Sequence, residues 1–226
     1  MSSIPQASTQ ALTWHYLAGP ARLCISAGEF TPGDLPPCAA EAAVVLDLAG
    51  ELLDGLAAAG LLGDVPWQWV AATGGMITGG AQASWRGAEA EARLSLPWAA
   101  LRALAAPPEV PGLQWQATPA ECLMAQWRLG DEELAALEPG GLLLLEEPVR
   151  PEPRARGESA AGDKPWQLVA RWEQPLTLDV VMGWCGPVPV PPPHCQLIDA
   201  ARPDAVRARG RLVPWGTGQA FRIDAI

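Results

Sequence analysis

Lysine is almost absent from this chain of 226 residues. Lys164 is the single lysine among 15 basic side chains, and 25 aspartates and glutamates give a net charge of −10. This charge excludes the nucleic-acid-binding classes, because phosphate contacts require a basic face. It also gives the chain no attraction to an anionic membrane surface. Basic proteins are the partners that the overall charge favours.

Long apolar runs are also missing. Hydrophobic residues make up 49% of the chain, which is typical of a globular protein. No stretch reaches the roughly 18 apolar residues that a membrane-spanning helix needs, and the first residues lack the basic and apolar regions of a signal peptide. We therefore expect a globular protein located in the cytoplasm.

Cysteines and histidines are few and scattered. An odd number of dispersed cysteines does not form a disulfide framework, which favours a reducing compartment. Cys185, His194 and Cys195 invite a zinc interpretation, but a structural zinc site needs four ligands, so we expect a surface loop with buried thiols. Neither His15 nor His194 lies in a recognisable nucleophile motif. We predict no catalytic residue, no cofactor and no metal, and a protein that is not an enzyme. The five cysteines are Cys24, Cys38, Cys122, Cys185 and Cys195.

Tyrosine and phenylalanine are scarce beside tryptophan, with one Tyr and two Phe against 11 Trp. Some tryptophans alternate with polar residues, as in Trp67-Gln68-Trp69, which directs one ring inward and leaves others available for an interface. Filling of the core is the simpler interpretation for any single ring. Exposed rings would instead suit a small-molecule or carbohydrate binding protein, and we keep this as the alternative function.

Alternation and chain breakers predict an α+β fold, with a mixed domain at residues 1–117 and a mostly β domain at residues 118–226. In the first domain we expect a strand at residues 42–49, a helix at residues 51–62 and a strand pair around the turn at residues 86–87. In the second, residues 147–165 are rich in proline, glycine and charge, which predicts a flexible insertion. Strands are expected at residues 166–173, 177–182, 206–213 and 220–226.

Residues 127–147 combine an alternating strand, a tight turn, a short amphipathic helical turn, a Pro-Gly break and an apolar strand. The pattern resembles the surface-presentation-of-antigens (SpoA) domain of the cytoplasmic-ring proteins of type III secretion systems and flagellar motors. The family usually places an aspartate after Pro-Gly, where this chain has Gly141. The residues that carry the resemblance are Leu129, Gly130, Leu134, Leu137, Pro139, Gly140 and Leu142 to Leu145.

Two further segments are similar to the same family. The end of the chain, with Gly210, Leu212 and Phe221-Arg222-Ile223, resembles the way such domains close. Residues 94–108 resemble the helix-bearing part of the N-terminal region of SctQ-type ring proteins. A full-length member carries two SpoA domains, and this chain has room for one, at residues 118–226.

The resemblance implies a scaffold component of the secretion cytoplasmic ring, or sorting platform, that acts by assembly with other proteins. It implies a homo- or hetero-oligomer formed with a second ring-protein fragment or a homologous SpoA domain, peripheral to the inner-membrane secretion apparatus. It also implies contacts with the stator and membrane-ring scaffold proteins. The expected assembly residues are Leu134, Leu137, Pro139, Gly140, Leu143, Leu145, Phe221 and Ile223.

Overall fold

The structure is a computed structural model that describes residues 13–27, 38–61, 65–70, 80–145, 151–156, 158, 165–184 and 189–226. The chain divides into two compact units, Met1–Gln116 and Ala117–Ile226. Both contain short helices and antiparallel sheet, so the fold is α+β. None of the helices in the described ranges is long and apolar enough to cross a bilayer.

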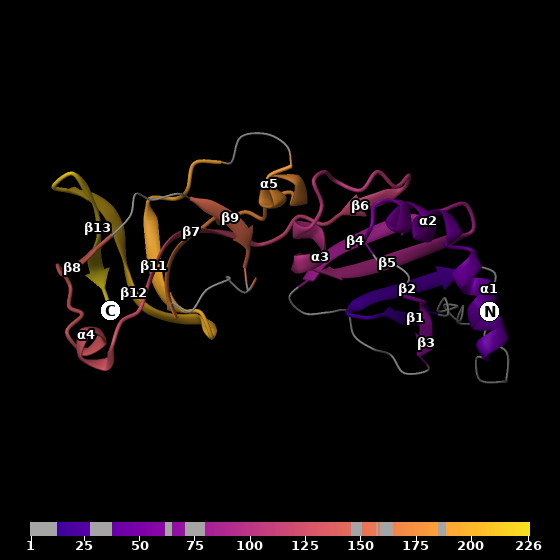
Figure 1. The fold of residues 1–226 in the computed structure, drawn as a ribbon, viewed down its shortest axis with the longest axis horizontal. Coiled ribbons are helices and arrows are strands. Elements are labelled where there is room, and N and C mark those ends of the chain that lie inside the picture. Colours follow the sequence, from indigo (N-terminus) through magenta and orange to yellow (C-terminus); the bar gives the residue numbers. More distant parts are fainter. Residues whose placement is uncertain are drawn as a thin grey trace, which may run out of the picture. The chain divides into compact units, whose positions relative to one another are not determined.

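The N-terminal unit is built on a six-stranded antiparallel sheet with the strand order β3-β1-β2-β5-β4-β6 (Figure 1). Two tight hairpins organise it. The first turns at Gly19, where φ is +55°, and pairs Ala18 with Ala21. The second is the strand pair expected around residues 86–87, which is confirmed. The strands are β1 (Thr13–Ala18), β2 (Ala21–Ala27), β3 (Gln68–Val70), β4 (Gly80–Arg86), β5 (Ala90–Pro97) and β6 (Leu113–Trp115).

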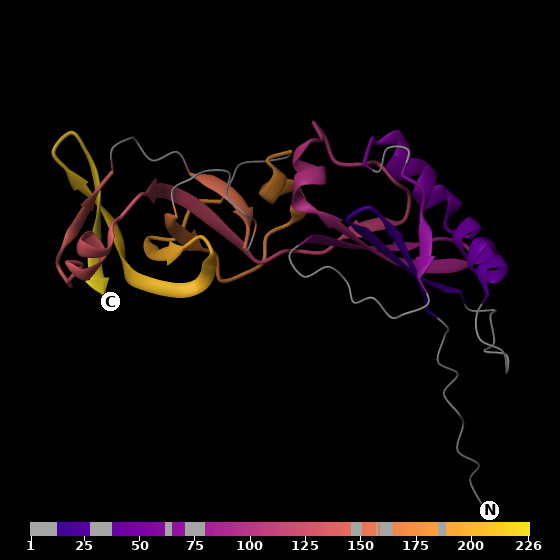
Figure 2. The same ribbon diagram turned by 60° about the horizontal axis from the view of Figure 1, so that its bottom comes forward.

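Helices α1 (Ala39–Asp47) and α2 (Gly50–Ala58) lie together along one face of this sheet (Figure 2). The Tyr16 hydroxyl donates a buried hydrogen bond of 2.7 Å to the carbonyl oxygen of Ala42, which ties β1 to α1. The expected strand at residues 42–49 is wrong. Buried side chains recur there at steps of three and four, which is the helical period, and the same stripe continues through α2. Its members are Ala42, Val45, Ala49, Leu52 and Leu56.

A third helix, α3 (Trp98–Arg102), follows β5 directly. Pro97 precedes its first turn, a position that suits proline because the first helical turn leaves its N–H groups unpaired and proline has none. Trp98 and Leu101 are buried. The opposite face of the sheet carries the alternate, mostly polar residues of the strands, and this is where the cavity described below lies.

The C-terminal unit is a seven-stranded antiparallel sheet with the strand order β8-β13-β12-β11-β10-β7-β9 (Figure 1). Irregular registers interrupt the β10–β7, β11–β12 and β12–β13 pairs, and such bulges bend and twist a sheet. The strands are β7 (Ala120–Trp127), β8 (Leu142–Leu144), β9 (Glu152–Ala155), β10 (Trp166–Arg171), β11 (His194–Asp199), β12 (Arg202–Trp215) and β13 (Gly218–Ala225).

The sheet curls so that strands far apart in its order meet. The Trp127 indole, at the end of β7, donates a hydrogen bond of 3.0 Å to the carbonyl oxygen of Leu144 in β8. The curl encloses a core of side chains from β7, β10, β11, β12 and β13. Its buried members are Cys122, Trp127, Leu168, Ala170, Cys195, Leu197, Ala208, Phe221 and Ile223.

One expectation for this unit is wrong, and two strands were not anticipated. Strand β9 lies within residues 147–165, where a flexible insertion is expected, and its Arg154 bonds to the buried Glu121. Residues 146–150, 157 and 159–164 lie outside the described residues. The strand expected at residues 177–182 is helix α5 (Leu178–Met182), whose buried Leu178 and Val181 are three residues apart. Strand β11 was also not expected; it follows a proline-rich stretch, which does not predict a strand.

Candidate functional site

The motif at residues 127–147 folds as a local unit between β7 and β13. Helix α4 (Asp131–Ala135) begins after Gly130, whose N–H donates to the Glu133 carboxylate at 2.8 Å. The Pro-Gly break is a tight turn in which Gly140 has φ +88° and the Gly141 N–H bonds to the Glu138 carbonyl oxygen. A positive φ at this position is the reason that the turn requires glycine. After this turn, β8 pairs with β13.

Strand β8 pairs with β13 over a longer stretch than its three residues. The Gly140 N–H bonds to the Ile223 carbonyl oxygen, the Ile223 N–H bonds to the Gly141 carbonyl oxygen, and the Leu145 N–H bonds to the carbonyl oxygen of Gln219. The two family-like segments, far apart in the sequence, therefore form one pair of strands.

Most of the eight expected assembly residues stabilise the unit from inside. Phe221 and Ile223 are fully buried in the core. Leu137, Leu143 and Leu145 are partly buried and pack against that core. Leu134 is half-buried, whereas Pro139 and Gly140 are exposed. The buried members therefore hold β8 and β13 in place within the unit.

Outward residues of β8 and of β12, the two neighbours of β13 in the sheet, form an apolar surface that the sequence did not reveal. We call Leu142, Leu144, Val213 and Trp215 the apolar patch; Leu144 and Trp215 are exposed, and the other two are half-buried. Leu144 and Val213 both pair with Ala220, and side chains two positions apart in a strand share a face. Leu144 is 56% and Trp215 54% exposed. The run of four leucines at residues 142–145 shows no alternation, so it could not indicate which of them face outward.

Strand β8 ends the sheet in the described part of the chain, with β13 on one side. An end strand offers backbone groups to another chain unless it is short or covered. Here it is short, and the Leu144 carbonyl oxygen already accepts the Trp127 N–H. The short β8 edge therefore offers little backbone for pairing with another chain. The apolar patch is the larger binding surface at this end of the sheet.

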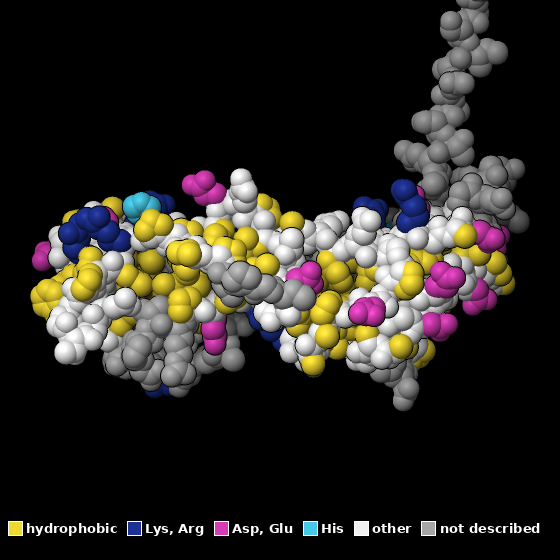
Figure 3. All heavy atoms as spheres, turned by 90° about the horizontal axis from the view of Figure 1, so that it is seen from above, with side chains coloured by type: hydrophobic (Ala, Val, Ile, Leu, Met, Phe, Trp, Pro, Cys, Tyr) yellow, Lys and Arg dark blue, Asp and Glu magenta, His cyan; other side chains and the backbone are white. Residues whose placement is uncertain are grey.

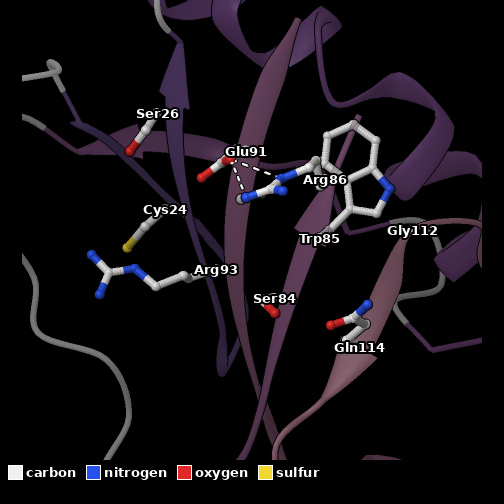
Figure 4. Close-up of a pocket in the computed structure, with 10 residues that line it drawn as sticks. Cys24, Ser26, Ser84, Trp85, Arg86, Glu91, Arg93, Gly112 and Gln114 are labelled. Carbon is white, nitrogen blue, oxygen red and sulfur yellow. Dashed lines mark hydrogen bonds and ion pairs between the residues drawn. The ribbon is translucent and has the colours of Figure 1, made fainter. Parts of the chain in front are cut away.

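A polar cavity of about 480 Å³ lies on the face of the N-terminal sheet opposite α1 and α2 (Figure 4). Side chains from four neighbouring strands line it. Arg86 and Glu91 form an ion pair of 2.7 Å across β4 and β5, and both are largely exposed. The other polar lining residues are Cys24, Ser26, Ser84, Arg93 and Gln114.

Beside this cavity the fold joins two residues that looked unrelated in the sequence. His15 and Cys24 are direct cross-strand partners in the β1–β2 hairpin, and a hydrogen bond of 3.1 Å links His15 Nδ1 and Cys24 Sγ. The signal for this pair was the Gly19-Pro20 turn, because a hairpin closing between residues 18 and 21 places residue 15 opposite residue 24.

The electrostatic environment keeps both groups of this pair neutral near pH 7. Burial raises the pKa of the Cys24 thiol, against a smaller opposing effect of the Arg93 charge. Burial and then the Arg93 charge lower the pKa of His15. A nucleophilic cysteine instead needs a lowered pKa, so that thiolate is present at neutral pH. The pair fits a structural bond across the hairpin.

The residues considered for zinc are not brought together in the described part of the structure. His194 and Cys195 are adjacent in β11 and so point to opposite faces. Cys195 lies in the core, and His194 is exposed. Cys185 lies outside the described residues. Among the residues that are described, no group of three or more His, Cys, Asp and Glu side chains is placed to hold a metal ion.

All 11 tryptophans lie in described ranges, and they fill the interior more than the surface. Trp14, Trp85, Trp98 and Trp127 are buried, and Trp215 alone is exposed. The remaining six are half-buried. A stacking platform for sugars needs several exposed rings, so the alternative of carbohydrate binding is left with one candidate side chain, which belongs to the apolar patch.

Comparisons of the chain with protein-family models, with curated proteins and with solved structures found no match.

Proposed function

We propose that this chain is a non-enzymatic structural component of a bacterial type III secretion cytoplasmic ring, or sorting platform. In this proposal residues 118–226 are a divergent SpoA-like domain and the preceding residues a mixed N-terminal domain. The observation that carries the proposal is the apolar patch on β8 and β12, which flank β13 and belong to the two segments that resemble the SpoA family.

The patch supplies the driving force for assembly. Apolar surface removed from water contributes about 25 cal/mol per Å², and a large exposed aromatic ring such as Trp215 is a typical anchor of protein interfaces. The partner in this proposal is a second ring-protein fragment or a homologous SpoA domain. Stator and membrane-ring scaffold proteins then join the paired unit on the cytoplasmic side of the inner membrane.

Two observations agree with a role in assembly rather than catalysis. The buried Phe221 and Ile223 give β13 a rigid base, so the patch is held in place before a partner arrives. The His15–Cys24 pair is held in its neutral form by burial, which does not suit a nucleophile.

The proposal is tested by co-expressing the full chain with a homologous SpoA-domain fragment of a secretion ring protein and measuring the mass of the complex by light scattering. We expect a stable complex for the native chain and its loss in the double variant L144D/W215D. The matched control is V44D, which changes a side chain in the N-terminal unit that is 52% exposed.

Thermal unfolding of each variant separates loss of pairing from loss of folding. A folded native chain that stays monomeric with this fragment would contradict the proposal. If V44D loses the complex to the same extent as L144D/W215D, the pairing surface would include the N-terminal unit, which would contradict the proposal.

A further inference from the structure

Three arginines share the outer face of β12 and β13, directly beside the apolar patch. We call Arg209, Arg211 and Arg222 the arginine face. Arg209 and Arg211 are two residues apart on β12, so their side chains project on the same side. Arg211 pairs in register with Arg222. Figure 3 shows arginine side chains gathered next to a histidine and to hydrophobic side chains on this unit.

The positive charge of this face is only partly neutralised within the chain. Asp224 bonds to Arg222 at 3.1 Å and lies 4.0 Å from Arg211. The Arg209 side chain makes no hydrogen bond or ion pair with the described residues. Like charges directly opposite each other destabilise a strand pair, so the Arg211–Arg222 register has a cost that one shared aspartate offsets incompletely.

The neighbouring positions add no further negative charge to this row. His194 pairs with Arg211 on one side, and Leu142 pairs with Arg222 on the other. The next row contains Val213, Ala220 and Leu144. The outer face therefore passes from a basic row to an apolar row within the distance of two residues along each strand.

This arrangement matches one kind of ligand. Guanidinium groups bind carboxylates with paired, charge-assisted hydrogen bonds. Same-side residues of an extended strand repeat at about 6.8 Å, so acidic side chains on alternate residues of an extended peptide match the spacing of Arg209 and Arg211. Apolar side chains of the same segment meet the apolar patch.

We propose that the arginine face docks an acidic, extended segment of a partner protein. The inference rests on the proposed function, because it names the chemistry of a partner that binds the same unit. The positive charge of the arginine face contrasts with the net charge of the whole chain, which is −10. Asp224 lies beside the arginine face on one side, and the apolar patch borders it on the other. The described arginines therefore form no continuous basic surface for a nucleic-acid backbone.

The test uses the folded full chain and short fluorescent peptides in which glutamate or glutamine alternates with valine, followed by fluorescence anisotropy at neutral pH. We expect the glutamate peptide to bind at least about tenfold more tightly than the glutamine peptide, since charge-assisted bonds supply the affinity. Its binding should weaken as salt is raised.

The variants locate the site. We expect R211S/R222S to reduce binding of the glutamate peptide by about tenfold or more, while R86S leaves it unchanged. Arg86 is the matched control because its side chain is 78% exposed and ion-paired in the other unit. Thermal unfolding verifies that each variant is folded, and R211K/R222K, which keeps the charge without the paired donors, should bind with intermediate affinity.

The outcomes separate this inference from the proposed function. Equal binding of the two peptides, or unchanged binding in R211S/R222S, overturns the inference alone. A single-stranded oligonucleotide bound more tightly than the glutamate peptide, with the same dependence on Arg211 and Arg222, also overturns it. Loss of peptide binding in R211S/R222S with pairing to the homologous fragment retained supports the inference. Failure of that fragment to bind a chain that still takes the peptide overturns the proposed function only.

Discussion

Arg154 donates two hydrogen bonds to Oε1 of Glu121, from Nε at 3.0 Å and from Nη2 at 2.7 Å, although 33 positions separate the two residues in the chain. Their exposed fractions are 7% and 1%. Oε2 of the same carboxylate accepts a bond of 3.1 Å from Nε of Arg171. Glu121 in β7 therefore joins β9 on one side to β10 on the other.

Replacing Glu121 with glutamine keeps its shape and removes its charge. Both arginines then lose their acidic partner, and Arg154 stays buried as an uncompensated cation. Breaking a buried pair in this way costs about 3–5 kcal/mol. We expect E121Q to lower the free energy of unfolding, measured by urea denaturation, by that order.

The control for this prediction is E91Q, which breaks the Arg86–Glu91 pair. Both of its partners are more than half exposed, and exposed ion pairs contribute about 0–1 kcal/mol. Similar effects of E121Q and E91Q would show that the buried carboxylate adds nothing beyond an ordinary surface pair.

Glycine at position 210 is required by close strand contact, and an alanine there should disrupt the C-terminal unit. A Cβ at Gly210 would clash with the carbonyl oxygen of Arg222 and lie 2.9 Å from Cε2 of Phe221. Because the first of these is backbone, β12 and β13 would have to separate locally. We expect G210A to lower the free energy of unfolding by about 3 kcal/mol or more.

The matched control is G50A in helix α2, where a Cβ meets nothing within 4 Å. Alanine favours a helix over glycine by up to about 1 kcal/mol, so G50A should be neutral or slightly stabilising in the same urea experiment. Unchanged stability in G210A would contradict the close β12–β13 contact.

The parts of the fold that the sequence predicts are those with local signals. The β4–β5 hairpin follows from alternation around a glycine turn, and α3 follows from Pro97 before an apolar helix turn. The error at residues 42–49 arose because Val44 and Val45 suggested a strand, whereas the deciding pattern was a helical stripe that extends as far as Leu56.

Other features depend on contacts between distant segments, and no local pattern contains them. The polarity of residues 147–165 predicts solvent exposure, but Arg154 is stabilised inside the unit by Glu121. The apolar patch and the arginine face also depend on contacts between segments that are distant in the sequence. Each depends on the register of β12 against β13, which became known only with the structure.

Two buried thiols predict the response of the protein to alkaline pH. Burial, with the neighbouring Cys195 and Glu152 charges, raises the pKa of Cys122 from 9.0 to about 12. Burial raises the pKa of Cys195 from 9.0 to about 11. A group whose pKa is raised by folding stabilises the folded state fully below its unfolded pKa. That contribution is lost as pH rises from 9 towards the folded values.

We expect the melting temperature to fall above pH 9, and the fall to be smaller in C122A/C195A than in the native chain, even though the variant is less stable at neutral pH. C38S, which changes an exposed cysteine, should keep the native pH profile. A C122A/C195A profile that runs parallel to the native one would exclude these thiols as the cause.

The bond from Trp127 to Leu144 predicts that the stability of β8 can be changed without touching the apolar patch. W127F keeps an aromatic ring in the core but removes the N–H that Leu144 accepts at 3.0 Å. A hydrogen bond of this kind contributes about 1 kcal/mol, so we expect amide hydrogen exchange in residues 142–145, measured by mass spectrometry, to accelerate by about fivefold.

The control is W172F, because the bond from Trp172 to the Val190 carbonyl oxygen is long, at 3.4 Å, and exposed. If β8 positions the patch for a partner, W127F should also weaken the complex with the homologous fragment, and W172F should not. Faster exchange in W127F with unchanged pairing would show that the partner binds without the ordered β8 strand.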